Sequence, residues 1–101
     1  GKGYTIVDSN WRCPHGEIDI IARDDVTLVF VEVRTRHSET TEIAFASISP
    51  GKQQRMIAAA NAYLDAHYTD SKIAWRIDVV AVALPRSGKA IIEHVEDALG
   101  W

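Results

Sequence analysis

The stretch "LVFVEVRTR", residues 28–36, decides the fold of this chain, because its first six residues resemble a strand that is buried on both faces. Glu32 interrupts this apolar run. A carboxylate left without a partner among valine and phenylalanine side chains would cost several kcal/mol of folding free energy. We therefore expect a proton or a cation to accompany Glu32 in the folded protein.

Length and composition place the chain among ordinary globular proteins. The 101 residues suffice for one compact domain, which we expect to span residues 1–101. The chain is 47% hydrophobic and 25% charged, contains one cysteine, and opens with no signal-peptide pattern or membrane-length apolar run. These features predict a cytoplasmic protein with no membrane role. The net charge of −3 means that any nucleic-acid binding must rest on a local basic patch.

Five extended segments are predicted from β-branched and aromatic residues and from turn signals. Residues 17–23 and 27–35 flank a short acidic turn and predict a hairpin. The other predicted strands are residues 3–12, 74–84 and 90–95. With one helix between the third and fourth strands, this order predicts an α/β fold with a mixed, mainly antiparallel sheet.

The helix is expected over residues 50–68, where Ser49 can cap it and Pro50 suits the first helical position. Three- and four-residue spacing predicts a buried stripe of Met56, Ala60, Tyr63, Leu64 and His67, with Lys52, Arg55 and Ala59 on other faces. Residues 36–48 are polar and irregular, and we expect a poorly ordered loop there.

The turn of the hairpin decides whether Asp19 and Glu32 meet. A two-residue loop at Asp24 and Asp25 places the two acids diagonally, and a four-residue loop places them directly opposite each other. A regular three-residue loop would put them on different faces of the sheet. Two adjacent carboxylates repel each other, and a hard divalent ion such as Mg²⁺ relieves that repulsion. Arg34 shares a face with Glu32 and could then contact a phosphate.

Three segments together resemble one known family: "NWRCPHGEIDIIARDDVTLVFVEVRTR" (10–36), "SPGKQQRMIAAANAYL" (49–64) and "RIDVVAVAL" (76–84). They are similar to the YraN family of endonuclease-like proteins, in the PD-(D/E)xK, restriction-endonuclease-like superfamily. The resemblance implies a central sheet with flanking helices and a site that binds Mg²⁺ (or Mn²⁺) and cuts DNA. It also implies an N-terminal helix bearing a further acid, which we expect to be missing because nothing before Tyr4 can supply it.

The resemblance assigns roles to particular residues. Asp19 would be the first metal ligand, Glu32 the second, and Glu17 an accessory acid. Arg34 stands where the superfamily motif has lysine. Because arginine stays protonated, Arg34 can clamp a phosphate but cannot act as a general base, so a metal ion would have to activate the water.

Simpler interpretations remain open for several of these residues. Glu32 and Arg34 could form only a salt bridge, and Arg76 with Asp78 is expected to be a structural ion pair. The spacing of Cys13 and His15 is poor evidence for zinc, because no second cysteine exists. Trp11 and Trp75 are expected to pack in the core or at an interface. A local basic rim that contacts nucleic acid, or else only a solvated face, could be formed by Arg34, Arg36, His37, Lys52, Gln53 and Arg55.

The sequence therefore predicts a magnesium-dependent nuclease acting on DNA, such as branched or damaged structures, with Asp19, Glu32 and Arg34 as catalytic residues. The alternatives are a nucleic-acid-binding module of the same fold that has lost catalysis, and a protein-interaction domain whose acids are structural. A homodimer is a further expectation, because nucleases of this superfamily often pair.

Overall fold

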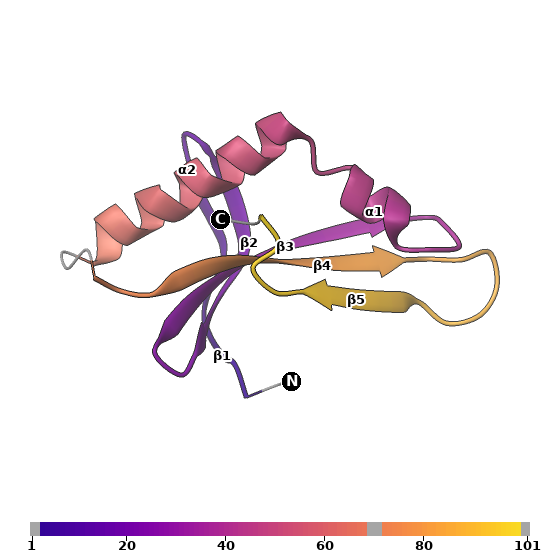
Figure 1. The fold of residues 1–101 in the computed structure, drawn as a ribbon, viewed down its shortest axis with the longest axis horizontal. Coiled ribbons are helices and arrows are strands. Elements are labelled where there is room, and N and C mark those ends of the chain that lie inside the picture. Colours follow the sequence, from indigo (N-terminus) through magenta and orange to yellow (C-terminus); the bar gives the residue numbers. More distant parts are fainter. Residues whose placement is uncertain (1–2, 69–71, 100–101) are drawn as a thin grey trace.

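The computed structural model describes residues 3–68 and 72–99, which form a five-stranded sheet and two helices (Figure 1). The strands lie in the sheet in chain order. They are β1 (Thr5–Cys13), β2 (Gly16–Asp24), β3 (Thr27–Arg36), β4 (Trp75–Ala83) and β5 (Ile91–Val95). The helices are α1 (Glu42–Ala46) and α2 (Pro50–His67). Neither helix has the length and apolar character needed to cross a membrane.

The sheet is mixed and mainly antiparallel, as predicted. Strands β3 and β4 pair in parallel, and the other three neighbouring pairs are antiparallel. A parallel pair needs a crossover connection, and the segment containing α1 and α2 provides it. Both helices lie on the same side of the sheet in Figure 1, so the helices and the sheet form two layers.

The β2–β3 hairpin turns one residue later than the two-residue loop at Asp24 and Asp25, which was one of the three loops considered. Asp24 pairs with Thr27, so the loop consists of Asp25 and Val26. Asp25 has φ 57°, in the left-handed region that aspartate tolerates better than most residues. The structure therefore excludes the alternative with a two-residue loop at Asp24 and Asp25, and the register is the one that the four-residue alternative predicted.

Helix α2 begins and ends where the sequence predicted. The Ser49 hydroxyl accepts a hydrogen bond from the Lys52 backbone N–H at 3.1 Å, and Pro50 occupies the first helical turn. The buried face, however, differs from the predicted stripe. Ala59 is 1% exposed although we placed it on another face, and His67 is exposed although we placed it in the stripe. The small Ala59 packs into the core, whereas the His67 ring stacks on Tyr63 in the last turn.

The connection between β3 and α2 is more structured than predicted. Residues Glu42–Ala46 form α1, and Thr41 and Ala44 are buried. The Thr41 hydroxyl donates a hydrogen bond to the Glu93 carboxylate of β5 at 2.6 Å. The expectation of a poorly ordered loop over residues 36–48 was wrong, because this polar segment packs on β3 and β4 instead of remaining in solvent.

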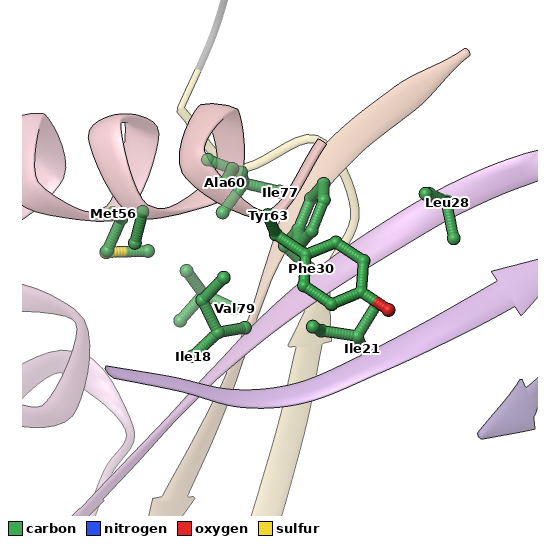
Figure 2. Packing of buried hydrophobic residues seen from close by; sticks show 10 residues of the cluster. Ile18, Ile21, Leu28, Phe30, Met56, Ala60, Tyr63, Ile77 and Val79 are labelled. Carbon is green, nitrogen blue, oxygen red and sulfur yellow. The ribbon is translucent and has the colours of Figure 1, made fainter. Parts of the chain in front are cut away.

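The core lies between α2 and the sheet (Figure 2). Trp11 meets Tyr63 edge to face, and Trp75 meets Phe30 in the same way, so both tryptophans pack against the core as predicted. Ile18 and Ile21 both belong to the core although they are three residues apart in one strand. If side chains alternated strictly along β2, Ile18 and Ile21 would point to opposite faces of the sheet. The alternation is therefore interrupted between these two residues.

Candidate functional site

Asp19 lies at the point where β2 changes face. The last β2–β3 pair before this point is Ile20 with Val31, and continuing that register by one residue brings Asp19 opposite Glu32. The Asp19 Oδ2 atom accepts a hydrogen bond of 2.8 Å from the Val33 backbone N–H. The side chain thus takes a hydrogen bond from β3 and is held beside Glu32.

Glu32 is a buried acid, 6% exposed, in the apolar centre of β3. Its pKa is raised above the ordinary value because burial disfavours the charged carboxylate and because the Asp19 charge and a hydrogen bond with Asp19 act in the same direction. Lys52 partly opposes this effect. The two acids therefore meet, as the sequence predicted. Their negative charges lie close together at a site where Glu32 is buried from water.

Two cations lie beside the Glu32 carboxylate, and one of them was not foreseen there. The Lys52 Nζ atom is 3.3 Å from Oε1, and the Arg34 Nη1 atom is 3.8 Å from Oε2. We placed Lys52 on a face of α2 away from the core and in a basic rim. Its side chain is instead only 24% exposed and directed to Glu32, which spacing along the chain could not reveal.

Arg34 is also fixed by a contact that the sequence did not suggest. Its Nε atom donates to the Ser47 hydroxyl at 3.0 Å, and its Nη2 atom donates to the Ser47 carbonyl at 3.4 Å. Ser47 is the C-cap residue of α1. The guanidinium of Arg34 is thus fixed by α1, whose existence the sequence did not predict.

Glu17 does not complete a three-acid cluster. It forms an ion pair of 2.7 Å with Arg12 across the β1–β2 hairpin. Within residues 3–68 and 72–99, no group of three or more histidine, cysteine, aspartate or glutamate side chains is arranged to hold a metal ion. This also leaves Cys13 and His15 without a zinc cluster in the described part of the chain.

The remaining residues of the predicted basic rim have other partners or are exposed. Gln53 donates from its amide to the Ile48 carbonyl at 3.4 Å, and Arg36 donates to the Thr35 carbonyl at 2.7 Å. Arg55 is exposed, as is the His37 side chain. Gln53 and Arg55 lie with Lys52 in the first part of α2, whereas Arg36 lies at the end of β3 and His37 directly after it.

The second predicted ion pair belongs to a different network. The Arg76 Nε atom donates to the fully buried Asp78 carboxylate at 2.9 Å. His94 of β5 lies 2.8 Å from the same carboxylate, and the Asp97 backbone N–H donates to it at 3.0 Å. Since Asp78 is fully engaged by these neighbours, we interpret this network as structural.

The five-stranded mixed sheet and its two helices are compatible with the restriction-endonuclease-like class of α/β proteins. Within that class, the family model of the Uncharacterised protein family UPF0102 matches residues 1–82. The chain therefore belongs to this family, which is the YraN family that its motifs resemble.

Individual relatives agree with this assignment. A UPF0102 protein of Roseiflexus castenholzii is 46% identical over 99 residues, covering 97% of this chain and 80% of the relative. A UPF0102 protein of Chloroflexus aurantiacus is 48% identical over 99 residues, with 97% and 79% covered. A UPF0102 protein of Streptomyces griseus is 44% identical over 92 residues, with 91% and 77% covered.

Proposed function

We propose that this protein is a nuclease that hydrolyses phosphodiester bonds of DNA at a metal site formed by Asp19 and Glu32. The observation that carries the proposal is the meeting of these two acids, one of them buried, at the place where β2 leaves β3. A buried acid such as Glu32, whose pKa is raised by burial and by the neighbouring Asp19 charge, is costly to maintain for structure alone. Such acids are typical of functional sites.

The donor set fits Mg²⁺ or Mn²⁺ better than an ion that needs a full protein cage. Mg²⁺ is commonly held by one or two carboxylates, with water and substrate phosphate as its other ligands. Asp19 and Glu32 supply two carboxylates, and Glu17 could assist only by leaving its ion pair with Arg12. When bound, the metal would polarise the phosphate and lower the pKa of a water molecule.

The chain's own residues would orient the acids and the substrate. The Val33 N–H holds the Asp19 carboxylate in place, and Ser47 fixes the guanidinium of Arg34 beside Glu32. Arg34 stays charged at any working pH and would bind phosphate oxygens, stabilising the negative charge that develops during hydrolysis. Arg36, Lys52, Gln53 and Arg55 would contact the nucleic-acid backbone.

The shape beside Glu32 favours a polymeric substrate over a small molecule. The hollow that Glu32 lines has a volume of about 10 Å³, enough for about one water molecule. Pockets that enclose small ligands are larger by more than an order of magnitude. A substrate that approaches across the surface, such as a DNA strand, suits this site better.

A second candidate is a nucleic-acid-binding module of the same fold that no longer cuts. The observation that favours it is Arg34, which stands where the superfamily motif has the lysine. Such a module would bind DNA with strong salt dependence and release no product.

The test is calorimetric titration of Mn²⁺ and Mg²⁺ into the wild type and Glu32→Gln, with cleavage of a branched DNA assayed on the same samples. We expect metal binding and cleavage by the wild type, and loss of both in Glu32→Gln, because one of the two ligands is removed. Glu42→Gln is the matched control, since Glu42 is exposed on α1, and it should behave as the wild type. Metal and DNA binding without cleavage would favour the binding module, and absence of metal binding would exclude the proposed site.

A further inference from the structure

Lys52 of α2 and Arg34 of β3 both contact the Glu32 carboxylate, but their side chains differ in how firmly other contacts hold them. The Lys52 ammonium is the nearer cation, at 3.3 Å from Glu32 compared with 3.8 Å for Arg34. Arg34 also donates two hydrogen bonds to Ser47, which hold it in one orientation. Lysine has a flexible four-carbon stem with a single charged group at its end. Of the two cations, Lys52 is therefore the one able to change partner.

The position of Lys52 in α2 is unfavourable for the helix itself. It lies in the first turn, where the helix dipole disfavours positive charge, and that turn contains no acidic residue. Helix stability therefore does not account for a lysine at this place. The Glu32 carboxylate does, because it is buried and the Lys52 charge lowers its pKa.

From these contacts we infer that Lys52 is an exchangeable cation and a catalytic residue of the site. It neutralises Glu32 in the metal-free protein, leaves that carboxylate when a divalent ion binds, and then contacts the substrate phosphate. Lys52 thus supplies, from a helix, the lysine that the strand motif lacks at Arg34. This inference rests on the proposed metal site and adds a residue that binds the substrate only when the metal is bound.

The inference predicts opposite effects of one substitution on metal binding and on cleavage. Lys52→Gln removes the competing charge, so the Mn²⁺ affinity measured by calorimetry should rise roughly tenfold. Cleavage of the branched DNA at saturating Mn²⁺ should fall on the order of 100-fold, because a charged contact to the reacting phosphate is lost. Lys52→Arg should return the metal affinity toward that of the wild type.

Lys89→Gln is the matched control, because Lys89 is exposed in the connection between β4 and β5, away from α2. It should leave the metal affinity and the cleavage rate unchanged. Circular dichroism and thermal unfolding would verify the fold of every variant. Lys52→Met, which keeps the apolar stem, takes the place of Lys52→Gln if that variant does not fold.

Only tighter metal binding combined with slower cleavage supports the inference. Weaker metal binding would mean that Lys52 merely positions Glu32, and unchanged cleavage would mean that Lys52 never contacts the substrate. Either result overturns the inference. The proposed function would still stand in that case, provided that the wild type binds metal and cleaves DNA. If the wild type itself binds no metal, the proposed function fails first and the inference fails with it.

Discussion

Glu32 and its neighbours show how one side chain links the core to the candidate site. Glu32 is 6% exposed, and its carboxylate is balanced by Lys52 from α2 and Arg34 from its own strand. Removing one partner of a buried ion pair costs much more than the pair itself contributes to stability. The side chains around Glu32 therefore respond as a group, and substitutions among them are expected to be non-additive.

The raised pKa of Glu32 predicts how stability depends on pH without divalent metal. The folded protein keeps this proton to higher pH than the unfolded chain, whose glutamate has the ordinary pKa of 4.5. The corresponding stabilisation is complete below that value and is lost as pH rises through the pKa of the folded state. Glu32→Gln cannot lose a proton, so its free energy of unfolding, relative to the wild type, should increase between pH 4 and pH 7. Urea denaturation of both proteins at the two pH values measures this difference, and parallel pH profiles would contradict it.

At the scale of elements, the start of α2 places Lys52. The Ser49 hydroxyl caps the Lys52 N–H, and Pro50 fixes the backbone where the helix begins. A shift in this turn would move the ammonium away from Glu32. The cap therefore affects both the helix and the site.

Ser49→Ala tests this arrangement. Loss of the cap should lower the free energy of unfolding by about 1 kcal/mol. Urea denaturation measures the loss, and Ser87→Ala, in an exposed bend between β4 and β5, should change it little. Equal stability of Ser49→Ala and Ser87→Ala would show that the cap contributes nothing.

The two helices differ in how far the sequence predicted them. Helix α2 has a serine cap, a proline in its first turn and many good helix formers among its 18 residues, and these are local signals. Helix α1 has five residues and no side-chain cap, and its neighbour Thr41 bonds to Glu93 of β5. Its formation depends on packing against distant strands, so a window of local sequence could not predict it.

At the scale of the whole molecule, the two faces of the sheet differ. One face carries α2, the apolar core and the acid pair. Elsewhere, Asp78 joins β4 to β5 through His94 and to the following turn through Asp97. Arg76 extends this network to Tyr4, the residue directly before β1. The Tyr4 hydroxyl accepts a hydrogen bond of 2.6 Å from the Arg76 Nη2 atom. The network thus ties the two edges of the sheet together.

Asp78→Ala should therefore destabilise the whole molecule. It leaves Arg76 and His94 without their shared buried partner, and we expect a loss of about 3–5 kcal/mol in the free energy of unfolding. Chemical denaturation measures this loss. Asp65→Ala is the control, since Asp65 is exposed on α2. A loss below that of the Asp65→Ala variant would mean that the network is dispensable.

The sequence by itself predicted the strands, helix α2 and, for two of the three hairpin loops considered, the meeting of Asp19 with Glu32. These features depend on local signals. β-branched runs, a helix cap and the length of one hairpin turn can each be recognised within a short stretch of sequence. Tertiary structure alone decided that Lys52 reaches Glu32 and that Ser47 holds Arg34. Both contacts join residues 13 or more positions apart through a helix packed on the sheet. No spacing in the sequence encodes them, because the crossing position of a helix is set by side-chain packing over the whole core.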